Sequence, residues 1–406
     1  MTARTIRRAL TAAALAAALA TTALTTTASA DTGRDHDRHA ATRAMMEAQV
    51  KAGVPGVLGQ AQDAHGTWNA SAGVADRGTG RERLPQDRFR IGSITKSFVS
   101  TVLLQLEAEG RLDIDDSVEH WLPGVVHGNG HDGGRITIRQ LLNHTSGVFN
   151  YTEDPAFFQQ ISTGFLEHRY ETRTPAQLVA TAMKHEPHFT PGKGWHYSNT
   201  NYVLAGMIVE KATGHSYASE VDKRVLKKAG MRSTTLPGTS ARVPGPHGRG
   251  YSKLFATAPD AKIHDVTELN PSWGWAAGEI ISTTGDLNRY YRALLRGDLL
   301  PERQQRELLT AVPTSDKPSS DAGYALGLST GKLSCGVTIW FHGGGIHGST
   351  SMASGTPDGR HTAAFNFNGD WAGDPNALLE AEYCGAKPMA ATTGTSKDLK
   401  KLTSLR

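Results

Sequence analysis

The stretch Ser93-Ile94-Thr95-Lys96 begins a predicted helix that ends at Gly110. After Lys96, apolar residues recur at helical spacing, namely Phe98, Val99, Val102, Leu103 and Leu106. Residues three positions apart lie on the same face of a helix, so the amine of Lys96 can reach the hydroxyl of Ser93. A serine hydroxyl becomes a strong nucleophile when a base removes its proton, and a partly desolvated lysine can be that base. The spacing S-x-x-K occurs by chance in many chains, so this interpretation needs further motifs.

Two further motifs follow in the chain. Tyr197-Ser198-Asn199 precedes a helix-like run over 202–214. In a turn or an extended segment its outer side chains lie on one side, so the phenol can transfer a proton and the amide can bond a substrate carbonyl. His342-Gly343-Gly344 follows a weakly alternating run over 336–341 that predicts a strand, with His342 at its end. Glycines at that place allow a substrate backbone to approach closely.

These motifs, in this order, resemble the S-x-x-K, Y-x-N and H-x-G signatures of penicillin-recognising active-site serine hydrolases. Longer strings strengthen the resemblance: Arg-Phe-Arg-Ile-Gly-Ser at 88–93, Leu-Leu-Asn-His-Thr-Ser-Gly at 141–147 and Tyr-Ser-Asn-Thr-Asn-Tyr at 197–202. They are similar to secreted actinomycete D-alanyl-D-alanine carboxypeptidases and to their class C β-lactamase-like relatives. The resemblance covers residues 40–385.

The resemblance implies a reaction through an acyl-enzyme. Ser93 would attack a carbonyl, Lys96 and Tyr197 would share the work of the general base, and Tyr197 would return the proton to the leaving group. Which of the two accepts the first proton stays open. The backbone N–H groups of Ser93 and Gly345 would bind the oxyanion, and Gly344 and Gly345 are assigned to substrate binding.

The resemblance also assigns the surrounding residues. His342 would stand in for the lysine of the commoner third motif and tune the electric field near Tyr197. Asn199 would hold the amide on the acyl side of the substrate. Trp273 would form a wall of the cleft, with a buried core tryptophan as the alternative. His144 is interpreted as structural.

The third motif departs from the carboxypeptidase pattern. The secreted enzymes carry threonine and arginine there to hold a terminal carboxylate, whereas this chain has Gly343, Gly345 and Ser329-Thr330-Gly331. Lys332 and His347 are the candidate replacements. We expect a secreted serine hydrolase similar to D-alanyl-D-alanine carboxypeptidases that acts on D-amino-acid peptides and reacts with penicillin. The alternatives are an esterase, a D-amino-acid amidase or peptidase, a weak class C-like β-lactamase, or a penicillin-binding protein without catalysis.

The ends of the chain predict export. Residues 1–30 form a predicted signal peptide, with early arginines, an Ala/Leu-rich run and Ala28-Ser29-Ala30 before Asp31. Residues 31–39 and 386–406 are predicted to be disordered, with the catalytic domain at 40–385 between them. The three arginines of the signal peptide account for most of the net charge of +4. The remaining balance favours neither nucleic acid nor an anionic membrane as a partner, and no second apolar stretch is long enough to span a membrane.

Alternation predicts strands at both ends of this domain, over 57–62, 68–74, 337–341, 350–354 and 362–368, around a centre that is mostly helical. This pattern predicts an α+β fold of the β-lactamase/transpeptidase type. An antiparallel sheet from both termini is flanked by helices, with a helical region inserted and the catalytic cleft between the two.

Cys335 and Cys384 are the two cysteines of the chain. In an oxidising compartment they predict one disulfide, with two free buried thiols as the alternative. No metal or cofactor is predicted. In particular, His185-Glu186-Pro187-His188 has the wrong histidine spacing for a zinc protease and contains a proline, so a surface loop is the better interpretation. We expect a monomer.

Overall fold

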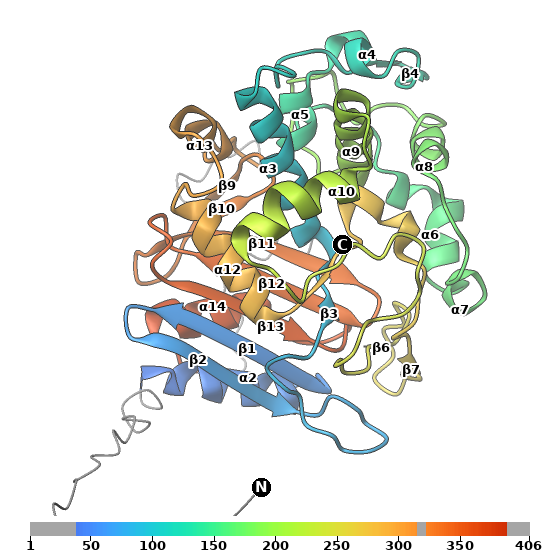
Figure 1. Ribbon diagram of the computed structural model, residues 1–406. Coiled ribbons are helices and arrows are strands. Elements are labelled where there is room, and N and C mark those ends of the chain that lie inside the picture. Colours follow the sequence, from blue (N-terminus) through green and yellow to red (C-terminus); the bar gives the residue numbers. More distant parts are fainter. Residues whose placement is uncertain (1–37, 315–321, 388–406) are drawn as a thin grey trace, which may run out of the picture.

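The computed structural model describes residues 38–314 and 322–387 (Figure 1). Its central element is a seven-stranded antiparallel sheet with the order β2-β1-β13-β12-β11-β10-β9. The strands are β1 (Gly56–Asp63), β2 (Gly66–Gly73), β9 (Ala322–Tyr324), β10 (Ser329–Lys332), β11 (Thr338–Ile346), β12 (Ser349–Gly355) and β13 (Thr362–Phe367). The first two strands of the chain thus pair with the last, as predicted for a sheet built from both termini.

Helices cover both faces of the sheet because its central strands are apolar on both faces. Along β13, Phe365 packs with Met46 of α2 (Ala40–Lys51) and Leu378 of α14 (Pro375–Cys384). The neighbouring Ala364 points the other way and packs in the core that contains Leu287 of α12 (Thr284–Leu295). This period of two is that of a strand buried on both faces.

In the sequence, the helical region lies between the short strands β3 (Phe89–Arg90) and β8 (Ile281–Ser282), which pair with each other. Its helices are η1 (Gly92–Ile94), α3 (Thr95–Ala108), α4 (Val118–Trp121), η2 (Gly133–Arg135), α5 (Ile138–Leu142), η3 (Tyr151–Glu153), α6 (Pro155–Ile161), α7 (Phe165–His168), α8 (Pro175–Ala182), α9 (Asn199–Thr213), α10 (Tyr217–Val221), η4 (Asp222–Leu226), α11 (Lys227–Ala229), η5 (Pro271–Trp273) and η6 (Trp275–Ala277). It also holds the pairs β4 (His127–Gly128) with β5 (His131–Asp132) and β6 (Tyr251–Ser252) with β7 (His264–Asp265). α13 (Glu302–Leu308) follows α12. The predicted fold class is confirmed.

The helix that carries the first motif is buried almost all round. Residues 95–107 of α3 are all buried, which fits a helix packed between α9 on one side and the sheet region on the other. The predicted helix start at Ser93 is a short 3₁₀ turn, η1, and α3 itself begins at Thr95. Ser93 therefore lies at the junction between the short strand β3 and the buried helix α3.

The strand predictions need two corrections. His342 does not end its strand, because β11 continues to Ile346 and Gly343, Gly344 and Gly345 pair with Met352, Ser351 and Thr350 of β12. Pairing with a neighbouring strand thus overrides the low strand propensity of three glycines. The short strand β9, at the edge of the sheet, and its neighbour β10 were not predicted.

The predicted signal peptide at 1–30, and most of the segments 31–39 and 386–406, lie outside the described residues. His39 is a correction to the predicted disorder of 31–39. It is buried, stacks on Trp68 at 4.6 Å between ring centroids and contacts Glu382 at 3.1 Å. Within the described ranges, no helix is long and apolar enough to cross a membrane.

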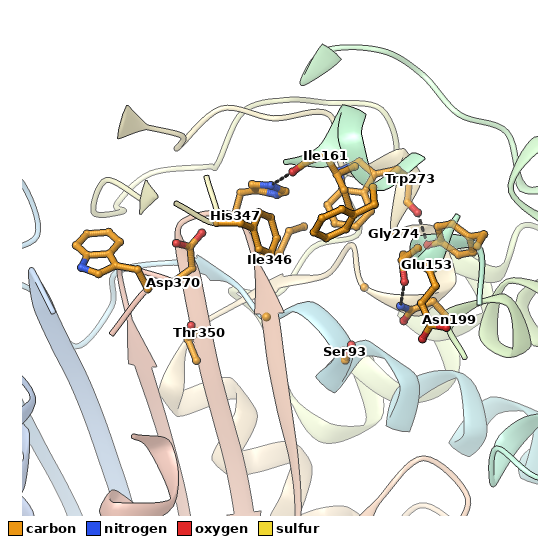
Figure 2. A pocket seen from close by; sticks show the side chains of 18 of the residues that line it. Ser93, Glu153, Ile161, Asn199, Trp273, Gly274, Ile346, His347, Thr350 and Asp370 are labelled. Atoms are coloured by element: carbon orange, nitrogen blue, oxygen red, sulfur yellow. Dashed lines mark hydrogen bonds between the residues drawn. The ribbon is translucent and has the colours of Figure 1, made fainter. Parts of the chain in front are cut away.

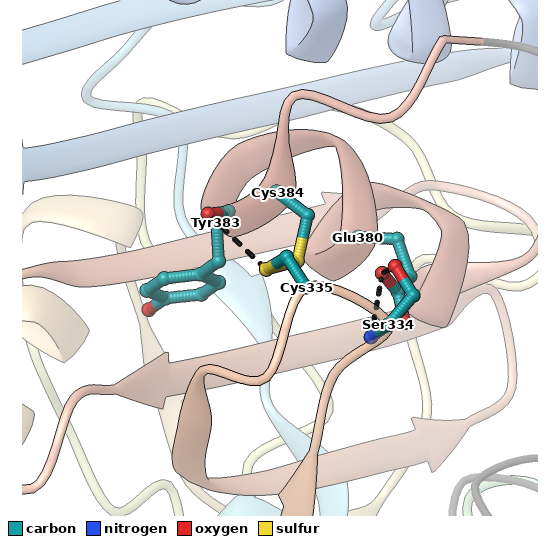
Figure 3. The surroundings of a disulfide bond; sticks show 5 residues. All are labelled: Ser334, Cys335, Glu380, Tyr383 and Cys384. Carbon is teal, nitrogen blue, oxygen red and sulfur yellow. Dashed lines mark hydrogen bonds between the residues drawn. A yellow bond between two sulfur atoms is a disulfide. The ribbon is translucent and has the colours of Figure 1, made fainter.

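The expected disulfide joins Cys335, in the turn between β10 and β11, to Cys384 at the end of α14 (Figure 3). Beside it, the backbone N–H of Ser334 donates to Glu380 at 3.1 Å, so the same turn is held to α14 twice. The bridge closes a loop of 49 residues.

Candidate active site

The first motif brings its nucleophile and base into contact. Lys96 Nζ lies 2.9 Å from Ser93 Oγ, across the step from η1 into α3. The same amine is hydrogen-bonded to Asn199 Oδ1 at 2.7 Å and to the backbone oxygen of Ala277 at 2.8 Å. S-x-x-K and Y-x-N, 103 residues apart, therefore meet at one nitrogen atom.

Lys96 is fully buried, and this burial holds its pKa well below the ordinary value for lysine. A neutral amine has two hydrogens and one lone pair. The oxygens of Asn199 and Ala277 can only accept, so they take both hydrogens. The lone pair is then left facing the hydroxyl of Ser93, which is the arrangement of a general base.

Tyr197 sits over this amine. Lys96 Nζ lies 4.8 Å from the centroid of the Tyr197 ring. Burial raises the pKa of Tyr197 well above its ordinary value, and the nearby Ser93 hydroxyl lowers it only in part. The hydroxyl of Tyr197 has no hydrogen bond that meets the geometric criteria within the described part of the chain. A phenol that stays protonated and unengaged is suited to donate a proton to a leaving group.

His144 positions the second motif. Its Nδ1 accepts from the backbone N–H of Ser198 at 3.2 Å and from Asn201 Nδ2 at 3.1 Å. Its ring packs against Tyr197 with centroids 4.2 Å apart. These contacts support the structural interpretation of His144.

Both polar atoms of the Asn199 side chain already have hydrogen-bond partners. Its Oδ1 accepts from Lys96, and its Nδ2 is 3.3 Å from the Thr152 hydroxyl. The structure thus places Asn199 as a support for Lys96. To hold a substrate amide, as predicted, its side chain must exchange one of these bonds.

The candidate oxyanion site lies where η1 touches β11. A side chain at Gly344 would place its Cβ 1.8 Å from the backbone oxygen of Ile91 and 3.2 Å from the Ser93 nitrogen. Gly92 has a left-handed φ of 52°, and a Cβ there would lie 2.8 Å from the nitrogen of Gly345. Only glycine permits this approach. It brings the backbone of Gly344 and Gly345 against that of Gly92 and Ser93. The predicted oxyanion pair, the N–H groups of Ser93 and Gly345, needs this close approach.

His342 lies two residues before Gly344 in β11 and so on the same face of the strand, where it is buried and does not line the pocket. Its Nε2 is 3.0 Å from the hydroxyl of Tyr324, and its ring centroid lies 6.4 Å from that of Tyr197. Burial, and secondarily the nearby Lys96, lowers the pKa of His342 to about 3. The ring is therefore neutral, and its influence on Tyr197 passes through packing and dipoles rather than charge.

Ser93 opens into a pocket of about 650 Å³. Figure 2 shows Ser93 at its floor, with Glu153 and Asn199 toward one end and Asp370 toward the other. Trp273 forms part of the wall, as predicted. The apolar lining includes Phe158, Ile161, Phe255, Trp273 and Ile346.

Lys332 and His347 were the candidate replacements for the residues that hold a substrate carboxylate in carboxypeptidases. Neither supplies a cation in the pocket. Lys332 lies in β10 and is absent from the pocket lining. His347 does line the pocket, but burial lowers its pKa to about 4, and its Nε2 donates to the Ile161 oxygen at 2.6 Å. Its ring is stacked on Phe165 at 3.8 Å.

Three charged residues of the lining were missed from the sequence: Glu153, Lys253 and Asp370. They lie in loops or a 3₁₀ turn, outside any motif. Glu153 follows Thr152, whose hydroxyl contacts Asn199. Lys253 Nζ donates to the backbone oxygen of Pro259 at 2.6 Å, which holds it on its own loop.

Comparisons with known proteins agree with this geometry. The profile of the family described as Beta-lactamase matches residues 9–382. A D-stereospecific amidohydrolase from Streptomyces sp. is 56% identical, with a TM-score of 0.81, over 86% of this chain and 99% of that one. The D-amino acid amidase from Ochrobactrum anthropi SV3, solved with D-phenylalanine, is 27% identical, with a TM-score of 0.72, over 85% of this chain and 98% of that one.

Curated relatives are more distant. Penicillin-binding protein 4* of Bacillus subtilis (strain 168) is 26% identical over 312 residues, which are 74% of this chain and 65% of that protein. Esterase EstB of Burkholderia gladioli is 35% identical over 171 residues, which are 41% of this chain and 42% of that protein. The chain thus spans less than two thirds of either relative. With a match over nearly its whole length, the chain belongs to the beta-lactamase family of serine hydrolases and is homologous to penicillin-binding proteins and D-amino acid amidases.

Proposed function

We propose that this protein hydrolyses amides of D-amino acids that carry a free α-ammonium group, through an acyl-enzyme on Ser93. The observation that carries the proposal is the sign of the charge in the pocket. Its charged lining residues are two carboxylates, Glu153 and Asp370, and one ammonium group, that of Lys253, which donates to the Pro259 oxygen, while His347 is neutral. A pocket of this kind favours a cationic end on the substrate over a terminal carboxylate.

Glu153 is the candidate anchor for the ammonium group. Asn150 Nδ2 and His196 Nε2 contact its Oε1 at 3.2 and 3.0 Å, which holds the carboxylate in place. The net effect of its surroundings lowers the pKa of Glu153, so the carboxylate is ionised at neutral pH. Burial raises that pKa, but His196 and Asn150 lower it by more. A charge-assisted bond from the substrate ammonium to this group would set the orientation of the acyl part.

The preference for the D-enantiomer and for an amide rests on the relatives. The Streptomyces protein, 56% identical, is a D-stereospecific amidohydrolase, and the Ochrobactrum protein is a D-amino acid amidase. The apolar lining supplies room for a large side chain, since Phe158 and Phe255 face each other at 5.4 Å between centroids beside Trp273.

In the proposed reaction, the proton of Ser93 moves to Lys96 as Oγ bonds to the carbonyl carbon. The oxyanion accepts from the N–H groups of Ser93 and Gly345. The C–N bond then breaks, and the departing nitrogen takes a proton from Tyr197, which regains it from Lys96. Ammonia leaves, the acyl group stays on Ser93 as an ester, and water hydrolyses this ester by the same proton path.

The test compares four substrates: D-phenylalanine amide, its L-enantiomer, N-acetyl-D-phenylalanine amide and an acyl-D-Ala-D-Ala peptide. We expect kcat/KM to favour the first over each of the others by at least tenfold. The Ser93→Ala variant should turn over none of them and should no longer be labelled by a fluorescent penicillin. A hundredfold preference for the acyl-D-Ala-D-Ala peptide would overturn the proposal in favour of a carboxypeptidase.

The anchor is tested by Glu153→Gln, which keeps the shape and removes the charge. It should lower kcat/KM for D-phenylalanine amide and leave the N-acetyl compound unchanged within about twofold, since only the former carries a cation. An equal effect on both compounds would contradict the anchor.

We also propose that residues 1–30 direct export and are removed. The mass of protein recovered from the culture medium should then correspond to a chain that begins at Asp31. A mass that includes residues 1–30 would contradict this.

A further inference from the structure

Beside the pocket, three side chains that no motif connects lie together. They are Glu153, at the end of η3, and His188 and His196, both on the loop between α8 and α9. The atoms that each would offer to a metal ion all lie within 4.8 Å of one another. From the sequence, the spacing of His188 to His185 does not fit a zinc protease, and in the structure His185 instead contacts Asp154 at 2.8 Å.

The distances fit one ion. Two ligand atoms on the same tetrahedral Zn²⁺ are about 3.4 Å apart, given metal–ligand bonds of about 2.1 Å. His196 Nε2 lies 3.0 Å from Glu153 Oε1, and His188 Nε2 lies 3.6 Å from Glu153 Oε2. Two imidazoles and one carboxylate form a ligand set that Zn²⁺ and its neighbours in the first transition row accept.

The two histidines are held by the same stretch of backbone. The N–H of His188 donates to the Gly147 oxygen at 2.8 Å, and that of His196 donates to the His144 oxygen at 3.1 Å. The two rings stack on each other with centroids 3.6 Å apart and 30° between their planes. The backbone contacts therefore keep the two histidines side by side, and one ring has to turn about its side-chain bonds for both Nε2 atoms to bind the same ion.

One atom of the cluster lacks a partner. His188 Nε2 is shielded from solvent and makes no hydrogen bond within the described ranges, although it faces the Glu153 carboxylate. The side chains of His188, His196 and Glu153 are nevertheless 19%, 38% and 42% exposed, so an ion can enter and keep water ligands. A bound cation would satisfy the buried nitrogen.

We propose that Glu153, His188 and His196 bind a divalent transition-metal ion, and that the bound ion inhibits the enzyme by occupying the carboxylate that anchors the substrate ammonium. The binding step does not depend on which substrate the enzyme uses. The inhibition rests on the proposed function, because it requires Glu153 to serve that ammonium group.

Binding is tested on the EDTA-treated, dialysed protein with Zn²⁺ by calorimetry and with Co²⁺ by visible absorption. We expect one Zn²⁺ per chain and a Co²⁺ spectrum typical of nitrogen ligands. The variants His188→Asn and His196→Asn should each weaken Zn²⁺ binding by at least tenfold. His185→Asn, a change on the same loop outside the cluster, is the matched control and should bind as the wild type does. Thermal unfolding of each variant without metal establishes that it is folded.

The absence of Zn²⁺ binding by the wild type, or equal binding by folded His188→Asn and His196→Asn, would overturn the site. The Co²⁺ spectrum of the wild type gives a test that needs no variant. For inhibition, Zn²⁺ should raise KM for D-phenylalanine amide at least tenfold and hardly change that for the N-acetyl compound. Zn²⁺ that binds without this difference would overturn the inhibition alone, whereas a failure of the proposed function would leave the calorimetric result intact.

Discussion

The amine of Lys96 lies 2.9 Å from the hydroxyl oxygen of Ser93 in a position without access to solvent. A lysine that deprotonates a serine must contact the serine hydroxyl and must also be neutral, whereas most lysines in proteins are charged. A lysine acts as a base only when it is neutral, and it is neutral near pH 7 only when burial disfavours its charge. The fold meets both by placing Lys96 on a helix that is buried almost all round. Replacing Lys96 by an apolar residue should therefore abolish activity but raise the free energy of unfolding.

The lowered pKa of Lys96 predicts how the effect of Lys96→Met on stability changes with pH. In the unfolded chain the amine has a pKa of about 10.4, whereas burial lowers it in the folded protein. The unfolded state thus binds more protons below pH 10.4, so the contribution of Lys96 to stability becomes more favourable as pH rises. The free energy of unfolding of the wild type, minus that of Lys96→Met, should increase between pH 7 and pH 10 by up to about 1.4 kcal/mol per pH unit.

Urea unfolding of both proteins at several pH values measures this difference, because the other titrating groups are common to both. Lys96→Met should also abolish acylation by penicillin. A stability difference that stays constant with pH would mean that Lys96 is charged in the folded protein.

The other proton carrier should behave differently on substitution. The Tyr197 hydroxyl is buried, and within the described residues it has no close hydrogen bond and only the Ser93 hydroxyl as a polar side-chain neighbour, so Tyr197→Phe removes a poorly satisfied polar group. We expect the melting temperature to stay level or rise, while kcat/KM falls by a factor of about 10² to 10⁴. Stopped-flow acylation together with thermal unfolding separates the two effects. A matched loss of stability and rate would indicate a structural role.

The sequence predicted the centre of this site well because the reacting groups lie in local motifs. S-x-x-K, Y-x-N and H-x-G each place one or two side chains within a few residues of sequence. Their order along the chain and their resemblance to a known family therefore pointed to Ser93, Lys96 and Tyr197. The paired strands at both termini were also visible, since alternation depends on neighbours in sequence.

The charge of the pocket could not be predicted in the same way. Glu153 and Asp370 come from a 3₁₀ turn and a loop that meet the pocket only through tertiary packing. The same is true of Glu153 with His188 and His196, which are separated by 35 and 43 residues. The surroundings of His342 were also not predictable, because its contact with Tyr324 depends on the unpredicted strand β9.

The disulfide should contribute to stability without contributing to catalysis. It ties α14 to the turn between β10 and β11, and neither cysteine lines the pocket. Replacing both cysteines by serine should lower the free energy of unfolding by about 4 kcal/mol, since the bridge closes a loop of 49 residues. Below the melting transition, kcat/KM should stay within about twofold of the wild type. Intact mass before and after reduction and alkylation verifies the bridge, and two cysteines that react without reduction would rule it out.

The last prediction concerns the far end of the substrate, where the enzyme departs from carboxypeptidases. Gly343 and Gly345 supply no side chain, His347 is neutral, and Lys253 is bonded to its own loop. A substrate that ends in a free carboxylate therefore finds no charge-assisted donor there, and Asp370 lines the pocket as well. For peptides that differ only at this terminus, we expect kcat/KM of the free acid and of its amide to agree within about tenfold, or roughly 1.4 kcal/mol. A hundredfold preference for the free acid would require Lys253 to leave the Pro259 oxygen and turn to the substrate. In that case Lys253→Met should remove the preference, whereas Lys332→Met, outside the pocket, should leave it intact.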